Sequence, residues 1–151
     1  MNLREDQILL LFSSRLKILA NKYNIYLSSS TQTNRQAKDD NNKDTSGLRG
    51  GSSLADKVDI GIMCFRAGEK EHDKLKHILE NGGYDKPNFS HWVFKNRGGV
   101  GGVVIWSVMD YGNMRETPLF ITDNDYNLLT QYQPLKMDFD VVKTDDNNPF
   151  N

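Results

Sequence analysis

The chain has 151 residues, of which 37% are hydrophobic and 26% are charged, and its formal net charge is -1. This length accommodates one domain with a small core and not comfortably two. No stretch approaches the roughly 20 apolar residues of a membrane span, and a single cysteine excludes an internal disulfide bond. We therefore expect a cytoplasmic globular protein. The near-zero net charge neither indicates nor excludes nucleic-acid binding.

The first segment is predicted to be a helix, because its apolar residues recur at spacings of three and four positions. These residues are Leu9, Phe12, Leu16, Leu19 and Tyr23. Residues 25–28 follow directly, consist mainly of β-forming residues, and are predicted to be a short strand. A helix that leads into a strand is typical of layered α/β folds.

Residues 28–53 are dominated by polar residues and glycine. This segment is far longer than the usual connection in a compact domain. We expect a mobile loop that orders on its ligand. Gln32 lies just after the predicted strand, and ligands in α/β sheets bind beyond the carboxyl ends of strands. A glutamine there can donate to a phosphate oxygen or hold a water molecule. The alternative is a solvated turn.

The end of the same segment places Arg49 among glycines and small hydroxyl residues. Glycines let main-chain N–H groups approach phosphates, and an arginine adds a charge-assisted contact. Arg49, Gly50 and Ser52 are therefore candidates for binding an anionic backbone. A flexible linker that ends in a helix cap is the alternative.

A third cluster, residues 95–102, combines two cations with a glycine-rich turn. Lys95 and Arg97 are two positions apart, so on a strand they point to the same face. A hairpin that projects positive charge is suited to deliver it into a neighbouring phosphoryl-transfer site, as an arginine finger does. Solvated basic residues on an ordinary hairpin are the alternative.

The other predicted elements surround these clusters. Cys64 lies in an apolar run and is predicted to be a small buried core residue, and Trp92 and Trp106 are predicted to pack in the core. The three histidines show no metal-ligand spacing, so no metal site is expected. The predicted elements are a helical turn at 54–57, strands at 58–65, 91–95 and 103–108, a short helix at 71–79, a hairpin turn at 98–102, and a frayed tail from about 143.

In this order the clusters resemble the DnaB-type hexameric replicative helicases. That family has a helix with an LK-x-LA pattern, a strand, an S-Q-x-N-R motif, a mobile loop with an L-R-E-S-G-like motif, and a K-x-R-x-G-x-x-G motif. This chain has RLKILA at 15–20, TQTNR at 31–35, LRGGS at 48–52, and Lys95, Arg97, Gly98 and Gly101. The resemblance covers roughly residues 4–108. Thr31 replaces the family's serine, and Gly50 replaces its acidic residue.

The resemblance implies a role for each matched residue. Gln32 would sense the γ-phosphate or the attacking water, and Arg97 would be the arginine finger that reaches the ATP of the adjacent subunit, with Lys95 beside it. Arg49, Gly50 and Ser52 would hold single-stranded DNA in the central channel, with Gly50 acting through its main chain. The implied complete protein is a homo-oligomeric ring that hydrolyses ATP with Mg²⁺, translocates on single-stranded DNA and unwinds duplex.

The implied fold is the C-terminal part of a RecA-like P-loop ATPase sheet over residues 1–110, with a β-hairpin near its C-terminal end. A partly irregular extension would occupy residues 111–151. No Gly-Lys-Ser or Gly-Lys-Thr occurs in the sequence, so we expect the Walker A and Walker B elements to be absent and the chain alone to be inactive. The glycine-rich loop suggests a phage or mobile-element relative. The alternatives are a non-catalytic single-strand-binding or ring-interaction module and a RecA-type recombinase fragment.

Overall fold

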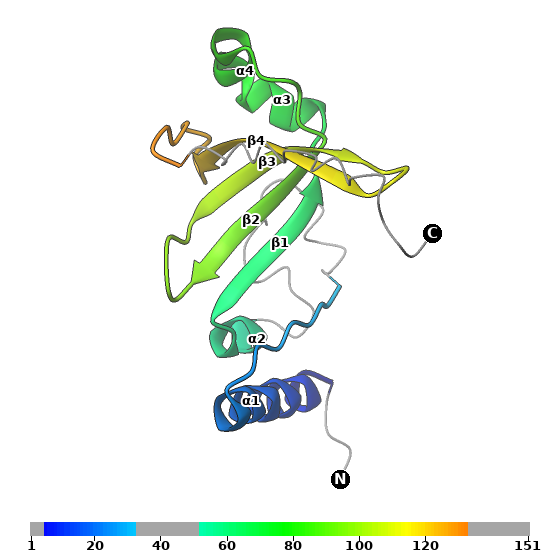
Figure 1. Cartoon of the computed structure of the whole chain (residues 1–151), viewed down its shortest axis with the longest axis vertical. Coiled ribbons are helices and arrows are strands. Elements are labelled where there is room, and N and C mark those ends of the chain that lie inside the picture. The colour runs from blue at the N-terminus through cyan, green and yellow to red at the C-terminus, as the bar shows by residue number, and fades with distance from the viewer. Residues whose placement is uncertain (1–4, 33–51, 133–151) are drawn as a thin grey trace, which may run out of the picture.

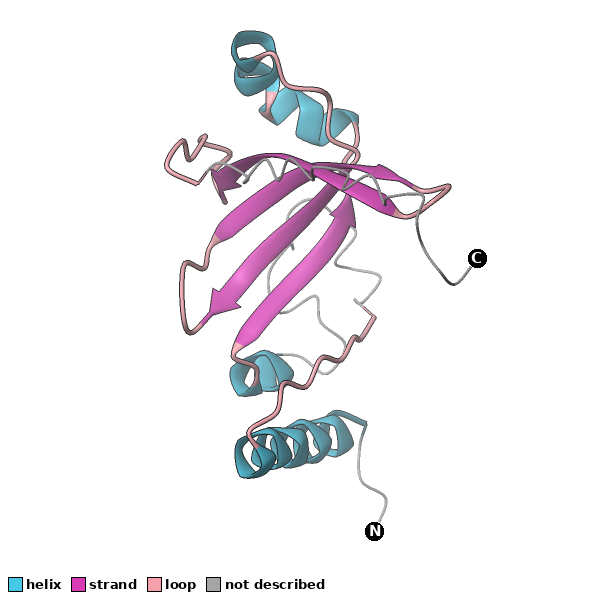
Figure 2. Ribbon diagram, viewed as in Figure 1, coloured by secondary structure: helices cyan, strands magenta, loops and turns pink. Residues whose placement is uncertain are grey.

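A computed structural model describes residues 5–32 and 52–132 of the chain (Figure 1). These residues form a mixed α/β fold in which four helices accompany one four-stranded sheet (Figure 2). The elements are α1 (Glu5–Tyr23), α2 (Ser52–Lys57), β1 (Ile60–Arg66), α3 (Glu69–Lys74), α4 (Lys76–Gly82), β2 (Phe89–Asn96), β3 (Val103–Asp110) and β4 (Arg115–Asp123). The expected combination of helices with a β-sheet is thereby confirmed.

The sheet is an antiparallel meander in which every strand pairs with its neighbour in the chain, in the order β1-β2-β3-β4. The predicted hairpin near the C-terminal end is confirmed as β2 and β3, with Val93 opposite Val103. Gly102 closes the turn at a φ of 71°, a conformation that glycine adopts without steric strain. Each of the described strand pairs is antiparallel, so the parallel strands of a RecA-like sheet are not among the described elements.

The core lies on the face of the sheet that α3 and α4 cover. Met63, Trp92, Val104 and Thr122 are successive partners across the four strands, and all of them are buried. Trp106, which is completely buried, stacks with Phe120 and lies next to them. The predicted packing of Trp92 and Trp106 in the core is confirmed. The helices contribute Leu75 and Ile78 to the same cluster.

The predicted single helix at 71–79 is instead two short helices that meet at Leu75. Leu75 leaves the helical conformation, with φ -88° and ψ 0°, and its side chain is completely buried. The break lets α3 and α4 both contact the sheet, because Leu75 and Ile78 can enter the core together. The Glu71 carboxylate accepts a 2.9 Å hydrogen bond from the Gly68 N–H and so caps the start of α3.

The predicted helix at the N-terminus is confirmed as α1, but much of its apolar stripe faces solvent: Phe12 is 58% exposed and Tyr23 60%. The prediction of a strand at 25–28 is wrong. Those residues have no regular secondary structure, and the Tyr26 side chain is fully exposed. β-forming residues make a strand only where another strand accepts their hydrogen bonds, and no such partner is present among the described residues.

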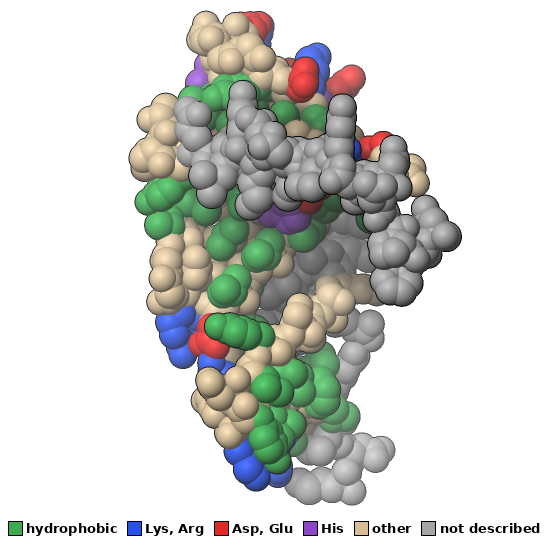
Figure 3. All heavy atoms as spheres, in the orientation of Figure 1, with side chains coloured by type: hydrophobic (Ala, Val, Ile, Leu, Met, Phe, Trp, Pro, Cys, Tyr) green, Lys and Arg blue, Asp and Glu red, His purple; other side chains and the backbone are tan. Residues whose placement is uncertain are grey.

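The prediction that Cys64 is buried is also wrong, because its side chain is exposed. The apolar run at 60–65 looks continuous, but β1 buries only the alternate residues that face α3 and α4. Cys64 and Ile62 point to the opposite face of the sheet. Hydrophobic side chains therefore lie exposed along the sheet and on α1 (Figure 3).

The strand β4 was not predicted, because the region after Tyr111 shows no clear pattern. It lies at an edge of the sheet, where Pro118 is tolerated opposite Ser107. The predicted tail from about 143 lies outside the described residues. Within the residues that the structure describes, no helix is long and apolar enough to cross a membrane.

Candidate functional site

The candidate site lies at the end of the sheet nearest α1, where basic side chains flank an acidic one (Figure 3). It is formed by Lys17 on α1, Asp59 just before β1, Lys95 near the end of β2, and Arg97 at the start of the hairpin turn. We call these four residues the basic junction. Two of them, Lys95 and Arg97, are site residues predicted from the sequence, and the other two were not predicted.

Arg97 is held by Asp59 through two separate contacts. Its main-chain N–H donates a 2.9 Å hydrogen bond to the Asp59 carbonyl oxygen. Its guanidinium Nη1 lies 3.1 Å from the Asp59 carboxylate, and the Arg97 side chain is 63% exposed. The main-chain contact fixes where the residue sits, while the exposed guanidinium remains open to solvent on its other sides.

Lys95 makes a different contact. Its ammonium group donates hydrogen bonds of 3.0 Å to the carbonyl oxygens of Ala55 and Asp56, in the last turn of α2. The carbonyl groups at the end of a helix have no partner within the helix and carry partial negative charge, so a lysine there is stabilising. Lys95 therefore joins the hairpin to α2.

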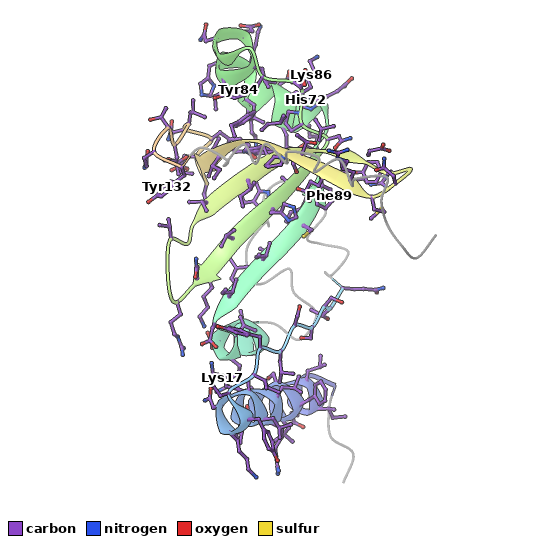
Figure 4. All side chains as sticks on the ribbon, in the orientation of Figure 1. Lys17, His72, Tyr84, Lys86, Phe89 and Tyr132 are labelled. Atoms are coloured by element: carbon purple, nitrogen blue, oxygen red, sulfur yellow. The ribbon has the colours of Figure 1, made fainter. Side chains whose placement is uncertain are left out.

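Lys17 completes the junction from α1, projecting toward α2 and the start of β1 (Figure 4). Its ammonium group forms an ion pair with the second carboxylate oxygen of Asp59. The hydrogen bond from Lys17 is the largest cause that lowers the pKa of Asp59 below its ordinary value of 3.8, and the charges of Arg97 and Lys95 lower it further. Asp59 is therefore ionised at neutral pH.

The other predicted site residues lie apart from this junction or outside the described residues. Gln32 is exposed, and among the described residues it forms no hydrogen bond with Lys95 or Arg97. Ser52 is the first residue of α2. Arg49 and Gly50 lie outside the residues that the structure describes.

A second group of polar side chains occupies the sheet face opposite the core. His91 Nε2 lies 2.6 Å from a carboxylate oxygen of Glu116, which also accepts a 2.5 Å hydrogen bond from the Ser107 hydroxyl. His91 Nδ1 lies 3.4 Å from the sulfur of Cys64. Partial desolvation raises the pKa of the Cys64 thiol and the Glu116 charge raises it further, so the exposed thiol is mainly protonated at neutral pH.

The two ring nitrogens of His91 point in opposite directions, so the ring links the Cys64 thiol to the Glu116 carboxylate. The described part of the chain contains no cluster of three or more histidine, cysteine or acidic residues arranged to hold a metal ion. The basic junction remains the site with exposed charge and a geometry suited to binding an anion.

Comparisons with known proteins give a relative without an assigned activity. The chain is 45% identical over 134 residues to the SPbeta prophage-derived uncharacterized protein YorI of Bacillus subtilis (strain 168). The matched region is 85% of this chain and 27% of that protein, so the chain spans about a quarter of the length of this relative. No family model matches the sequence, and no solved structure matches it.

Proposed function

We propose that this chain is part of the motor domain of a ring-forming, ATP-driven replicative DNA helicase of the DnaB type. In this proposal Arg97 is the arginine finger that contacts the nucleotide bound to the adjacent subunit. The observation that carries the proposal is the position of Arg97: it begins a glycine-rich turn, its guanidinium is 63% exposed, and the residue is anchored through its main chain. A guanidinium in that setting can form bidentate contacts with a phosphate brought to it.

The fold is compatible with the C-terminal end of a RecA-like sheet. Among the described residues β1 pairs with β2 on one side and with no strand on the other. An unpaired edge of this kind accepts a further strand, so the antiparallel meander can extend a parallel sheet at β1.

The DNA-binding role belongs in this proposal to the segment before α2. Arg49 and the main chain of Gly50 would contact the phosphate backbone, with Ser52 at the start of α2. Contacts of this kind position a nucleic acid without reading its sequence, which suits a motor that moves along single-stranded DNA. Gln32 would respond to the γ-phosphate.

ATP and Mg²⁺ would be held in the complete protein mainly by residues that this chain does not contain, since the sequence has no phosphate-binding Gly-Lys-Ser or Gly-Lys-Thr. This chain would contribute positive charge and, through Gln32, a donor to the nucleotide site. The prophage origin of the relative supports a phage or mobile-element source for the helicase.

The decisive experiment replaces the matching region of the longer relative with this chain and measures DNA-stimulated ATP hydrolysis by the chimera. We expect Arg97→Ala to lower kcat by about 10³-fold or more while nucleotide binding survives, because an arginine finger acts on the transition state. Arg115→Ala is the matched control, since Arg115 is an exposed arginine at the start of β4. ATPase activity that is insensitive to Arg97→Ala would refute the finger assignment.

A second measurement tests the DNA-binding role on the chain itself. Fluorescence anisotropy of a labelled single-stranded oligonucleotide is recorded for wild type and Arg49→Ala at two salt concentrations. We expect salt-sensitive binding that the substitution weakens, because each phosphate contact releases counterions. DNA binding in a chimera that hydrolyses no ATP would instead favour a non-catalytic single-strand-binding module.

A further inference from the structure

Arg97 contacts Asp59 in two ways, and one contact is more easily broken than the other. The main-chain hydrogen bond to the Asp59 carbonyl, at 2.9 Å, belongs to the backbone at the end of the β1–β2 pair. The guanidinium–carboxylate contact, at 3.1 Å, joins two exposed side chains. Exposed ion pairs are weak and readily exchanged. The guanidinium can therefore leave the carboxylate without breaking the main-chain hydrogen bond.

Departure of the Arg97 guanidinium does not leave Asp59 unpaired. Lys17 holds the other carboxylate oxygen, and its side chain is only 29% exposed. Because the carboxylate keeps this cation, exchanging Arg97 between Asp59 and an incoming anion leaves no isolated charge. Lys17 therefore makes the exchange easier.

Lys95 brings α2 into the same arrangement. It is two residues before Arg97 on the same strand end, and its ammonium group binds the last-turn carbonyl oxygens of α2 at 3.0 Å. Asp59 follows α2 after only one residue, Val58. A shift of the hairpin turn at Arg97 can therefore displace α2 by two routes. One route is the Lys95 hydrogen bonds, and the other is the main chain between α2 and Asp59.

We propose that Asp59 is the resting partner of Arg97, which the guanidinium leaves when it captures a phosphate, and that Lys95 is a positioning residue that transmits this exchange to α2. The proposal rests on the proposed function only in identifying the anion as the nucleotide of the adjacent subunit. It adds a competing carboxylate and a mechanical link to α2, the helix that follows the proposed DNA-binding segment. Asp59 thereby regulates the arginine finger.

The first test titrates inorganic tripolyphosphate into the ¹⁵N-labelled chain and follows the side-chain Nε–Hε signal of Arg97 by NMR. We expect Asp59→Asn to tighten tripolyphosphate binding by about 2- to 5-fold, because the competing carboxylate charge is gone. Lys17→Met should weaken binding, because Asp59 then depends on Arg97 alone. Arg97→Ala should abolish binding at this site.

Asp56→Asn is the matched control. It removes the same charge from an exposed residue three positions away, so it reports the general effect of net charge near the site. We expect its affinity for tripolyphosphate to stay within about 1.5-fold of wild type. Equal gains in tripolyphosphate affinity in Asp56→Asn and Asp59→Asn would overturn the role of Asp59. An affinity that Lys17→Met does not lower would overturn it as well. Misfolding would weaken tripolyphosphate binding in either variant. A gain in Asp59→Asn together with a loss in Lys17→Met therefore cannot both be caused by misfolding.

The second test concerns α2. In wild type we expect tripolyphosphate to shift the amide signals of α2 together with the Arg97 signal. Lys95→Met should keep the Arg97 shift and reduce the α2 shift, because the route through Lys95 is removed. Survival of the full α2 shift in Lys95→Met would overturn the link. These measurements use the chain alone. They can support the role of Asp59 even if the ATPase activity of the chimera is insensitive to Arg97→Ala. The two proposals can therefore fail independently.

Discussion

The indole N–H of Trp106 donates a 2.9 Å hydrogen bond to the hydroxyl of Thr122, and both side chains are completely buried. The bond crosses from β3 to β4 in the middle of the aromatic core, where Trp106 also contacts Phe120 and Tyr126. A buried donor without a partner loses its hydration and gains nothing in return. This pair therefore fixes how β4 packs on the core.

We predict that Thr122→Val lowers the free energy of unfolding by about 1–3 kcal/mol, because valine keeps the shape of threonine and removes the acceptor. Urea unfolding followed by tryptophan fluorescence measures the change. Thr117→Val is the control, since Thr117 lies exposed on the same strand. Equal losses in the two variants would show that loss of a threonine hydroxyl at any position, and not loss of this buried hydrogen bond, is responsible.

A second prediction concerns Gly61, where β1 passes directly under the ring of Phe94. A Cβ atom at Gly61 would lie 2.1 Å from Phe94 Cζ, and the strand pairing is irregular beside it. Gly61→Ala should therefore destabilise the protein by about 1–3 kcal/mol through overpacking. Thermal unfolding by circular dichroism checks this. Gly98→Ala is the control, because no atom lies within 4 Å of its added Cβ; an equal effect there would contradict the steric explanation.

The Cys64 thiol gives a prediction about reactivity. Partial desolvation and the Glu116 charge raise its pKa above the ordinary value of 9.0, so less thiolate is present at pH 8 than in a free thiol. We expect Cys64 to react with iodoacetamide more slowly than glutathione does. Glu116→Gln should speed the reaction, because it removes a charge that opposes ionisation. Glu80→Gln, on α4, should have no effect; a rate unchanged in Glu116→Gln would refute the electrostatic contribution.

A further prediction is the pH dependence of the loop after β4. The Asp123 carboxylate accepts hydrogen bonds from the side chain and the main chain of Asn127 and from the main chain of Asp125. The Asn127 side chain contributes most, and together these bonds lower the pKa of Asp123 below its ordinary value of 3.8. A lowered carboxyl pKa in the folded state stabilises the fold above the unfolded pKa, and this stabilisation is lost as pH falls through the folded pKa.

We therefore expect wild type to be more stable than Asp123→Asn near pH 7, and the difference to shrink as the pH falls below about 4. Urea midpoints measured from pH 7 to pH 3 test this. Asp125→Asn, a neighbouring exposed acid, should show little change in the same series. A constant difference between wild type and Asp123→Asn at all pH values would contradict the role of the charge.

The sequence predicted the elements that carry a strong local pattern. The helix α1, the turn of helix at α2 and the strands β1, β2 and β3 all lie within a few residues of their expected positions. The failures came from tertiary context: residues 25–28 have β-forming side chains and no described partner strand. Cys64 lies on the face of the sheet opposite α3 and α4, and an unbroken apolar run cannot show which side chains face that way.

Only part of the candidate site was predicted from the sequence. Lys95 and Arg97 stand out because they flank a glycine-rich turn, and the structure places both against the segment before β1. Their partners were missed, because Lys17 and Asp59 are 42 residues apart and the RLKILA motif around Lys17 gives no sign of an acidic partner. Only the fold brings such pairs together. An exposed arginine beside a glycine-rich turn nevertheless indicates that a carboxylate partner can lie nearby in the fold.

The meander order of the sheet has a consequence for folding kinetics. Since β3 and β4 each pair with the preceding strand across a short connection, two of the three strand pairings close loops that are short in sequence. Folding rates of small proteins rise as the sequence separation between contacting residues falls. We expect this unit to refold within about milliseconds after dilution from denaturant, faster than β-sandwiches in which distant strands must meet. During synthesis, each strand can dock on the one that the ribosome has just released.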